Sequence, residues 1–341
     1  MFRFGFADPK GEPAEPAAPS DGPGEASAEH IGAEEVPDSE SKPTGAQETA
    51  VISPELSLIK GVVSNAQAAN ILSDERVEEN DLIAGVYEGG FKTWEGGLDL
   101  AQFVALQLDT QRAAGQQAQP AEAGEQEHQE QQQWAAQLGP GSRVMELGCG
   151  HGLPGLVALW AGAEVHFQDY NRSVLTTLTM QNVAANRSAW ASRSAWASHR
   201  QAAAAPSSET GAAASAAAAS SSGEQSDAAV ARYFAGSWDA LPGLLEELGL
   251  QHSYDLLLTA ETIYSLEAMR SLYRAIKACL RPGSGVALVA AKSYYFGVGG
   301  GTAAFTKLVR EDGRFSCEQV AVINDGASNK REILRLAPLP A

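Results

Sequence analysis

One short segment, VMELGCGHGLPG at residues 144–155, constrains the fold of this chain more than any other. An apolar strand runs into a carboxylate, Glu146, and then into a turn that contains Gly148, Gly150, Gly152 and Gly155. Glycines let the backbone bend sharply and come close to a bound molecule, where a side chain would collide. The helix that follows points its N-terminal N–H groups back at that molecule. The segment therefore predicts a nucleotide-containing cofactor at a strand–helix turn, and two classes of cofactor share this geometry.

The rest of the core alternates predicted strands and helices. The apolar runs YDLLLT (254–259) and GVALVAA (285–291) are typical of strands buried on both faces of a parallel sheet. We expect strands at 142–147, 163–168, 230–235, 254–260, 284–291, 315–323 and 331–337, and helices at 97–108, 154–161, 171–186, 266–280 and 301–312. The connection at 324–330 is too short for a helical crossover, so the last two strands must be antiparallel. The prediction is an α/β fold with a Rossmann-like, mostly parallel sheet that ends in an antiparallel strand.

Acidic and low-complexity segments surround this core. Residues 1–50 hold 11 acidic and 3 basic residues, and half of the 16 prolines lie before residue 55. We predict a disordered tail over 1–55 and one domain over 56–341. A Gln/Glu/Ala tract at 111–133 and an Ala/Ser tract at 187–229 are predicted to be surface loop insertions.

A few aromatic residues in these segments have open roles. Trp190 and Trp196 belong to a six-residue tandem duplication at the start of the Ala/Ser tract, and we interpret both as incidental. Phe2, Phe4 and Phe6 alternate as one face of a strand would, and either docking or a frayed terminus fits them.

Charge and cysteine content restrict the function classes. The net charge is −18 and the longest basic run is Lys330-Arg331, which argues against direct nucleic-acid binding and would suit a basic protein partner. Three separated cysteines, Cys149, Cys279 and Cys317, fit free thiols in a reducing compartment. No apolar run reaches the roughly 18 residues of a membrane span, and the N-terminus lacks the apolar core of a secretion signal. We expect a monomer in the cytoplasm and nucleus that binds no membrane.

The glycine turn alone does not choose between the cofactors. Residues 150–155 match the G-x-G-x-x-G pattern of dinucleotide binding. Asp169 falls where the carboxylate side chain that binds the ribose hydroxyls is expected. Glu146 favours a methyltransferase, in which an acid at this place orders the loop or holds the methionine ammonium group. The alternative is that Glu146 has a purely structural role and only caps the end of the strand.

Three more strand ends carry candidate site residues. Asp169 closes the second strand, and Asn171 after it is a good N-cap. GSW at 236–238 follows the third strand, where the ring of Trp238 either covers an adenine or packs in the core. TAETIY at 259–264 ends the fourth strand, and ligands of open α/β sheets bind beyond the carboxyl ends of strands. Glu261 and Tyr264 would face the substrate there, unless they are a helix N-terminal acid and a core aromatic.

These residues carry a family resemblance. The segments YEGGFKTWE (87–95), ELGCG (146–150), HFQDYN (166–171), TAETIY (259–264) and YFGVGGG (295–301) occur in this order. Together they resemble the eukaryotic histidine protein methyltransferase family, a branch of the seven-strand methyltransferases, over about 81–110, 134–186 and 230–336. Ala260 and Asn324 depart from the family pattern, which more often has Ser and Asp there, and the Ala-rich insert is peculiar to this chain.

The resemblance implies S-adenosylmethionine as cofactor and a histidine of a large-subunit ribosomal protein, the third in standard naming, as acceptor. It implies a cofactor site lined by Thr93, Trp94, Glu95, Gly96, Gly97, Gly148, Gln168, Asp169, Tyr170, Gly236, Ser237, Trp238 and Ala260. The glycine turn adds Glu146, Gly150 and Gly152 to this predicted site.

The implied reaction needs positioning and exclusion of water more than acid–base help, because the sulfonium methyl group is already activated. The acceptor imidazole must be neutral, with a proton on one ring nitrogen. A group that accepts this N–H would fix the tautomer and stabilise the cation that forms, and Glu261 and Tyr264 are the candidates. The glycines at 297–301 either let a peptide backbone approach or form a flexible turn. His151 and His166 lack the spacing of a metal site, so we expect no metal.

Three other functions remain open. The first is lysine methylation by the same fold, which would require the acceptor to lose a proton first. The second is an NAD-dependent oxidoreductase. The third is a non-catalytic, cofactor-binding module in ribosome assembly.

Overall fold

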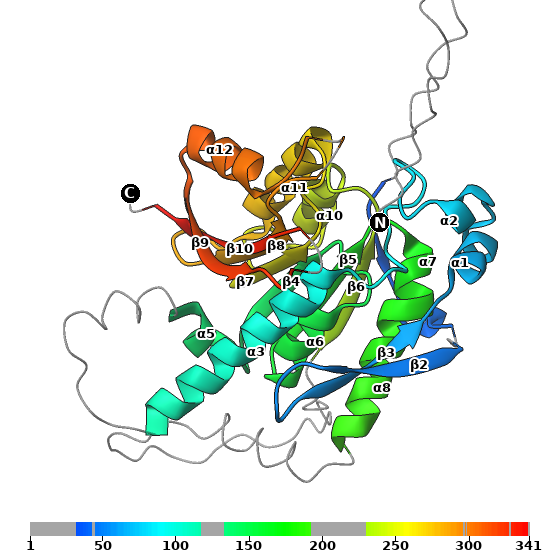
Figure 1. The fold of residues 1–341 in the computed structure, drawn as a ribbon. Helices are drawn as coiled ribbons and strands as arrows, with labels where there is room; N and C mark the ends of the chain where they lie inside the picture. The colour runs from blue at the N-terminus through cyan, green and yellow to red at the C-terminus, as the bar shows by residue number, and fades with distance from the viewer. Residues whose placement is uncertain are drawn as a thin grey trace, which may run out of the picture.

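The computed structural model describes residues 32–42, 45–116, 133–191, 230–295, 297, 299–326 and 329–339. Its centre is an eight-stranded sheet in the order β1-β6-β5-β4-β7-β8-β10-β9 (Figure 1). The strands of this sheet are β1 (Glu34–Val36), β4 (Arg143–Leu147), β5 (Glu164–Asp169), β6 (Ala231–Ala235), β7 (Leu256–Ala260), β8 (Val286–Lys292), β9 (Phe315–Ile323) and β10 (Arg331–Pro338). The seven strands from β4 to β10 correspond to the seven predicted ones.

The five strands β4 to β8 are parallel and nearly fully buried, as the apolar runs predict. The chain first builds from β4 outward through β5 to β6, and then returns to add β7 on the other side of β4. In such sheets the crevice at the carboxyl ends beside this change of direction is the usual ligand site. The glycine turn after β4 therefore lies at the expected place.

The antiparallel end of the sheet is confirmed. Strand β10 lies between β8 and β9 and is antiparallel to both. The connection between β9 and β10 is a hairpin, because no helix intervenes.

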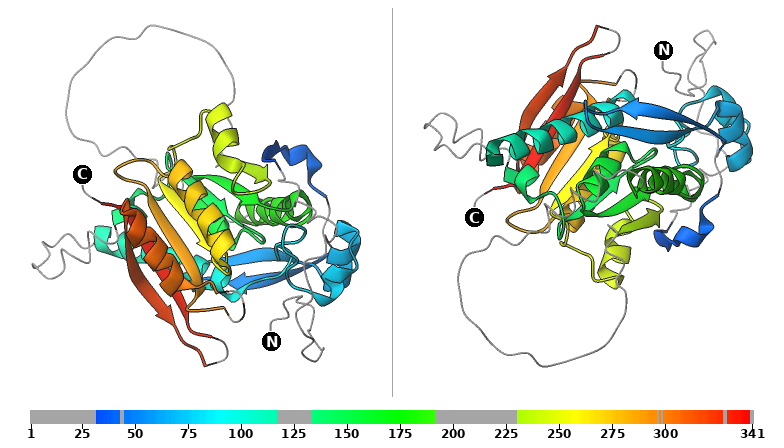
Figure 2. Two further views of the ribbon diagram at one scale, coloured as in Figure 1. Left: turned by 90° about the horizontal axis from the view of Figure 1, so that it is seen from above. Right: turned by 90° about the horizontal axis from the view of Figure 1, so that it is seen from below.

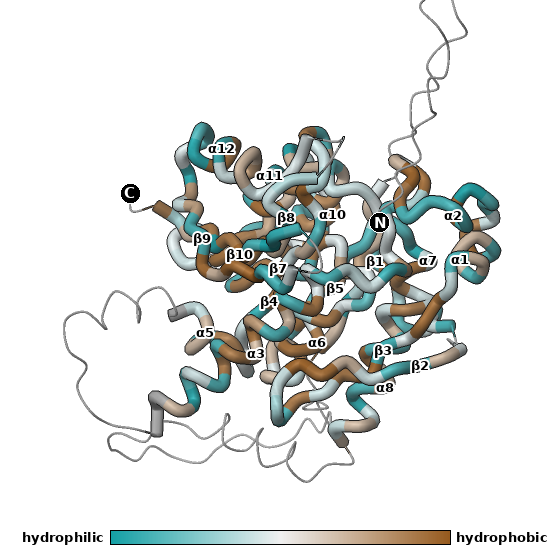
Figure 3. Tube along the Cα trace, viewed as in Figure 1, coloured by the Kyte–Doolittle hydropathy of each residue, from teal (hydrophilic) through white to brown (hydrophobic). Residues whose placement is uncertain are grey.

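Helices cover both faces of the sheet (Figure 2). One face carries α3 (Glu95–Gln116), α5 (Gln133–Gln137), α6 (Leu153–Trp160) and α8 (Met180–Ala191), with α7 (Arg172–Val174) and the π-helical turn η2 (Leu175–Thr179) leading into α8. The other face carries α10 (Leu241–Glu247), α11 (Leu266–Cys279) and α12 (Thr302–Asp312). Two apolar cores result, one on each face. Figure 3 shows hydrophobic residues concentrated along the inner strands and α6.

A small hairpin of β2 (Ala46–Val51) and β3 (Ser57–Val62) lies against α8, followed by α1 (Asn65–Leu72) and α2 (Arg76–Glu79). Two buried amides of α8 hold the hairpin. Asn182 Oδ1 accepts from Gly61 N at 2.7 Å, and Asn186 Oδ1 accepts from Ile59 N at 2.9 Å. The sequence did not predict this hairpin or helices α1, α2 and α10.

Our prediction of a disordered tail over 1–55 is wrong for its second part. Strand β1 pairs with β6, a short 3-10 helix η1 (Asp38–Glu40) follows, and β2 lies within the same range. Ion pairs fasten this segment, because Glu35 binds Arg232 at 2.7 Å and Glu34 binds Arg172 at 2.5 Å. Strand β1 is ordered because it forms backbone hydrogen bonds with the edge of the sheet at β6. Local composition does not show such a distant partner, so a prediction from composition alone called this segment disordered. Phe2, Phe4 and Phe6 lie outside the described residues.

The inserts also begin later than predicted. Helix α3 continues to Gln116 and α8 continues to Ala191, so both helices extend into the tracts. Trp190, which we interpreted as incidental, is 3% exposed and belongs to the larger apolar core, together with Leu58 of β3. Trp196 and the remainder of both tracts lie outside the described residues. Within the described part of the chain, no helix is long and apolar enough to cross a membrane.

A candidate active site at the carboxyl ends of the parallel strands

The acid before the glycine turn holds the turn in shape. Glu146 Oε2 accepts from Gly155 N at 2.8 Å, in the first turn of α6. Burial raises the pKa of this carboxyl well above its usual range, although the Gly155 N–H opposes that shift. A Cβ on Gly155 would overlap both Glu146 Oε2 and the Phe167 ring. Gly155 is therefore needed for packing behind the turn, and not for the approach of a cofactor.

Gln168 connects two loops through three hydrogen bonds. Its Oε1 accepts from Trp238 Nε1 at 2.8 Å and from Gly148 N at 3.3 Å. Its Nε2 donates to Gly236 O at 2.8 Å. The Gln168 amide is itself 1% exposed, and it fixes the ring of Trp238 against the glycine turn. A Cβ on Gly148 would come 2.8 Å from Thr262 and 3.4 Å from Trp238, so only glycine leaves space between them.

Asp169, predicted to bind a ribose, is buried and already accepts two backbone hydrogen bonds. Its Oδ2 accepts from Gly150 N at 2.9 Å, and its Oδ1 accepts from Asn171 N at 3.1 Å. Only 3% of the residue is exposed, and Gly90 packs on it so closely that a Cβ there would come 3.2 Å from Oδ1. Burial raises the pKa of Asp169 to about 6. Each oxygen keeps a further lone pair, and the ribose role stays a prediction.

The loop after β5 fastens the YEGG segment. Asn171 stands at the N-cap of α7 but makes no side-chain cap bond, contrary to our prediction. It instead accepts from Glu88 N at 3.2 Å and donates to Val86 O at 2.8 Å. Tyr170 donates its phenolic hydrogen to Gly85 O at 3.0 Å. These bonds draw residues 85–91 over the carboxyl end of β5.

The loop after β6 is shaped by the N-terminal segment. Gly236 has a φ of 119°, and its N donates to Asp169 O at 3.0 Å. A Cβ there would overlap the backbone of Gly32, which crosses the loop. Ser237 Oγ accepts from Ala240 N at 3.3 Å and so turns the chain toward α10. The predicted adenine loop is therefore ordered partly by a contact that no local pattern shows.

The TWEGG residues stand where α3 begins, across from the glycine turn. Thr93 Oγ1 lies 3.1 Å from His151 Nε2, and Trp94 Nε1 donates to Gly89 O at 2.9 Å. Glu95, the first residue of α3, lies 3.8 Å from Lys292 Nζ. Gly97 has open space around it, whereas Gly96 faces Glu261.

Glu261 is the most constrained candidate. It follows Ala260, the last residue of β7, and has a left-handed φ of 59°, which is unfavourable for a residue with a side chain. It is 8% exposed; Oε2 accepts from the Tyr295 hydroxyl, and Oε1 is buried without a hydrogen-bond partner among the described residues. A Cβ on Gly96 would come 2.7 Å from Oε1. Burial raises the pKa of Glu261, while the Tyr295 bond, the charge of Lys292 and the nearby backbone N–H of Gly96 oppose that shift.

Tyr264 belongs to a separate pair. Its hydroxyl donates to Glu88 Oε2, and Glu88 Oε1 accepts from Gly85 N at 2.8 Å. Burial and the Glu88 charge raise the pKa of Tyr264. The phenolic hydrogen is thus already used, which leaves Glu261 Oε1 as the better acceptor for a substrate N–H. The partners Glu88 and Tyr295 were not among our predicted site residues, although both lie in the motifs that carry the resemblance.

The glycines of YFGVGGG have two different roles. Gly300 N donates to Tyr264 O at 3.1 Å and Gly301 N donates to Ile263 O at 2.9 Å, and a Cβ on either would overlap backbone of this chain. Around Gly297 there is open space, and Gly299 meets only Leu266 at 3.9 Å. Of these glycines, Gly297 and Gly299 therefore leave room for the approach of a peptide backbone that we expect here.

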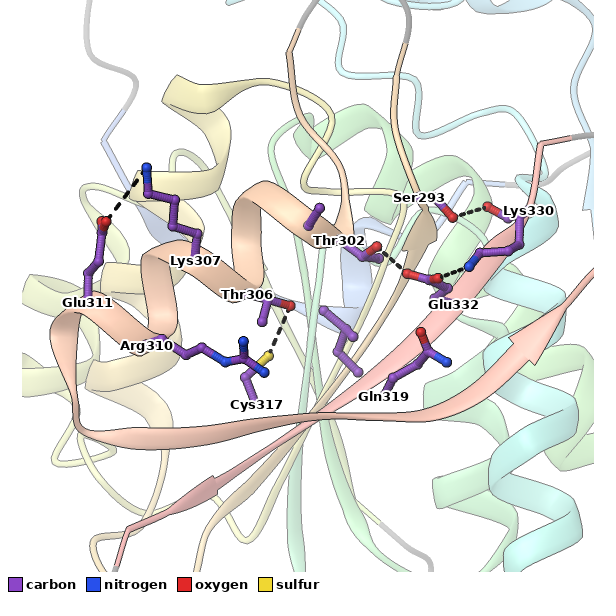
Figure 4. Close-up of a pocket in the computed structure, with 12 residues that line it drawn as sticks. Ser293, Thr302, Thr306, Lys307, Arg310, Glu311, Cys317, Gln319, Lys330 and Glu332 are labelled. Carbon is purple, nitrogen blue, oxygen red and sulfur yellow. Dashed lines mark hydrogen bonds and ion pairs between the residues drawn. The ribbon is translucent and has the colours of Figure 1, made fainter.

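An open groove of about 760 Å³ lies between α12 and the β9–β10 hairpin (Figure 4). Thr302, Thr306 and Arg310 line it from α12, with Cys317 and Gln319 from β9 and Glu332 from β10. None of the predicted site residues lines this groove, so we place the candidate active site at the strand tips.

His166 and Cys149 lie in surroundings that are typical of structural residues and not of catalytic ones. His166 contacts Glu164 and Tyr254, each at 2.8 Å, inside the sheet. Burial raises the pKa of the Cys149 thiol well above its usual range, so it is not a reactive thiolate. The described residues contain no group of three or more His, Cys, Asp or Glu that could hold a metal ion.

Comparisons with known proteins agree with the motifs. A "histidine protein methyltransferase 1 homolog" of Dictyostelium discoideum is 30% identical over 264 residues, which are 77% of this chain and 62% of that protein. Proteins of the same name from Bos taurus and Mus musculus are 32% and 34% identical over 77% and 75% of this chain. The predicted family resemblance is confirmed. This chain spans about three fifths of the length of these relatives, and no protein-family model matches it.

Solved structures give weaker matches. A 16S rRNA N2 G1207 methyltransferase of T. thermophilus, in complex with AdoMet and guanosine, has a TM-score of 0.42 at 14% identity, over 86% of this chain and 50% of that one. A magnesium protoporphyrin IX methyltransferase of Synechocystis PCC 6803, with bound SAM, has a TM-score of 0.38 at 12% identity, over 73% and 86%. The fold assignment rests on the sheet order described above.

Proposed function

We propose that this chain is an S-adenosylmethionine-dependent protein-histidine N-methyltransferase that acts on a large-subunit ribosomal protein, the third in standard naming. The observation that carries the proposal is Glu261. A buried carboxylate in a strained backbone conformation at the tip of the fourth parallel strand, with one oxygen that has no side-chain hydrogen-bond partner among the described residues, is typical of a functional group. The names of the relatives support histidine as the acceptor.

The residues around the glycine turn fit S-adenosylmethionine. Glycine at position 148 lets the turn pack directly against Thr262 and the flat ring of Trp238. Gln168 fixes that ring, and Asp169 holds Gly150 while keeping lone pairs for hydroxyl donors. We infer that Trp238 covers the adenine and that Asp169 faces the ribose. Thr93 to Gly97 would contact the amino-acid end.

The chemistry assigns a role to Glu261. The cofactor supplies a methyl group that is already activated, so the chain needs to orient the acceptor and exclude water. A neutral imidazole carries a proton on one ring nitrogen, and Glu261 Oε1 would accept that N–H. The other nitrogen is then directed toward the methyl group, and the carboxylate offsets the positive charge that the ring acquires. Tyr295 orients the carboxylate through Oε2.

The proposed partner is consistent with charge. A net charge of −18 favours association with a basic protein, and the cytoplasm and nucleus are the proposed locations.

Two peptides that differ only in the acceptor test the proposal. Each carries one nucleophilic side chain, either His or Lys, in the same flanking sequence, and is incubated with the chain and S-adenosylmethionine. We expect methylhistidine from the first and no product from the second. Methyl-lysine would instead support lysine methylation. Binding of NAD without binding of S-adenosylmethionine, measured by calorimetry, would overturn the choice of cofactor.

A further inference from the structure

A buried ammonium group lies next to the glycine turn, and neither the motifs nor the proposed function assigns it a role. Lys60, in β3 of the extra hairpin, is only 8% exposed. Its Nζ donates to Thr93 Oγ1 at 2.8 Å, and the same Thr93 oxygen lies 3.1 Å from His151 Nε2 in the glycine turn. The hairpin thus places a positive charge close to the turn, with only the Thr93 hydroxyl group between Lys60 and His151.

The second partner of this ammonium group is a surface carboxylate. Lys60 Nζ forms an ion pair with Glu48 of β2, whose side chain is 56% exposed. A lysine has three N–H donors, and these two contacts use two of them. Because the Glu48 side chain is more than half exposed, a ligand carboxylate can join it beside Lys60 or take its place as the partner of the buried ammonium group.

The hydroxyl of Thr93 is suited to an anion as well. Its oxygen has two neighbours that can donate to it, Lys60 and one tautomer of His151, and its own hydrogen is then available to a ligand. His151 is neutral, because burial first and the Lys60 charge second lower its pKa to about 3. The positive charge at this end of the turn therefore resides on Lys60.

The two ends of the glycine turn differ in polarity. At Gly148 the turn meets the apolar ring of Trp238, and at His151 it meets Thr93 and, through it, Lys60. A ligand that lies along the turn would find an aromatic surface at one end and a cation with a hydroxyl donor at the other. S-adenosylmethionine has this polarity, with an adenine at one end and an amino-acid carboxylate at the other.

We propose that Lys60 and Thr93 bind the carboxylate of the cofactor, and that the β2–β3 hairpin is present to supply this charge. The inference rests on the proposed cofactor. It predicts that recognition of the carboxylate, and not of the nucleoside, depends on a residue outside the methyltransferase sheet.

Two ligands separate the carboxylate from the rest of the molecule. S-adenosylhomocysteine carries it, whereas decarboxylated S-adenosylmethionine lacks it and also carries a sulfonium charge, so each ligand is compared between protein variants and not with the other ligand. Dissociation constants of both are measured by calorimetry for the full chain and for Lys60→Met. A charge-assisted hydrogen bond to a carboxylate contributes about 1.5–3 kcal/mol, so we expect Lys60→Met to weaken S-adenosylhomocysteine binding about 10–100-fold. The decarboxylated ligand should bind both proteins within about twofold.

Three further variants sharpen the test. Thr93→Val keeps the shape and should weaken S-adenosylhomocysteine about 3–10-fold, with no change for the decarboxylated ligand. Glu48→Gln releases Lys60 and should leave binding equal or tighter. Lys277→Met removes an equivalent charge from α11, where Lys277 pairs with Asp312 at 2.9 Å, and should change neither constant.

The outcomes distinguish this inference from the proposed function. Binding of neither ligand to the unaltered chain would overturn the cofactor itself. Binding of both, with equal weakening or none in Lys60→Met and Thr93→Val, would overturn only the role of Lys60 and Thr93.

Discussion

The Tyr295 hydroxyl donates a hydrogen bond to Glu261 Oε2 and so joins the loop after β8 to the tip of β7. The other oxygen, Glu261 Oε1, is buried next to Gly96 in the first turn of α3 and has no side-chain hydrogen-bond partner among the described residues. Three motifs that are far apart in sequence meet at this carboxylate.

Glu261→Gln should lower kcat about 100-fold, because an amide presents one weaker acceptor and no charge to a substrate N–H. The dissociation constant of S-adenosylhomocysteine should stay within about twofold. Tyr295→Phe, which frees the carboxylate without removing it, should cost about tenfold in kcat. Steady-state rates together with calorimetry check this, and a Glu261→Gln enzyme as active as the parent would refute the role.

Tyr264 should matter less for chemistry than Glu261. Tyr264→Phe removes the bond to Glu88 but no acceptor for the substrate, so kcat should remain above about a tenth of the parent value. The free energy of unfolding should fall by about 1–2 kcal/mol, because the half-buried Glu88 loses a donor. A loss of kcat that exceeds the loss in Glu261→Gln would reverse the two assignments.

The affinity for S-adenosylhomocysteine should depend on pH through Asp169. Its pKa is raised to about 6 in the free protein, and hydroxyl donors prefer the anion, so binding should weaken as pH falls through 6. Between pH 7 and pH 5 the dissociation constant should rise about tenfold. Asp169→Asn should bind more weakly and show a flat profile, and an equal slope in both proteins would exclude Asp169 as the source.

Gly155→Ala should destabilise the domain by about 3 kcal/mol, because its methyl group has to displace Glu146 and Phe167. Gly243→Ala in α10 is the matched control, since nothing lies within 4 Å of a Cβ there, and it should be neutral or stabilising by about 0.5–1 kcal/mol. Chemical denaturation measures both, and equal stability of the two variants would contradict the packing argument.

The sequence predicted the central sheet well, because continuous apolar runs and a connection without room for a helix have few structural solutions. Strands β7 and β8 and the antiparallel β10 lie where the pattern placed them. Strand β2, AQETAV, is largely exposed, and β1 is three residues long, so neither has an apolar pattern to detect. Their order comes from partners distant in the chain.

The motifs proposed members for the candidate site but could not give the contacts between them. Motifs named Glu146, Gln168 and Glu261. They could not show that Gln168 holds Trp238, because the pairing spans 70 residues of sequence. Nor could they show the left-handed backbone of Glu261, which the surrounding fold imposes.

The identity of the methylated residue tests the central claim most directly. The chain is incubated with labelled S-adenosylmethionine and purified ribosomal proteins, and the labelled position is mapped by mass spectrometry, with Glu261→Gln in parallel. We predict a single methylhistidine in a large-subunit protein, formed at most about one hundredth as fast by Glu261→Gln. Label on lysine, or no label from a chain that binds the cofactor, would contradict the account.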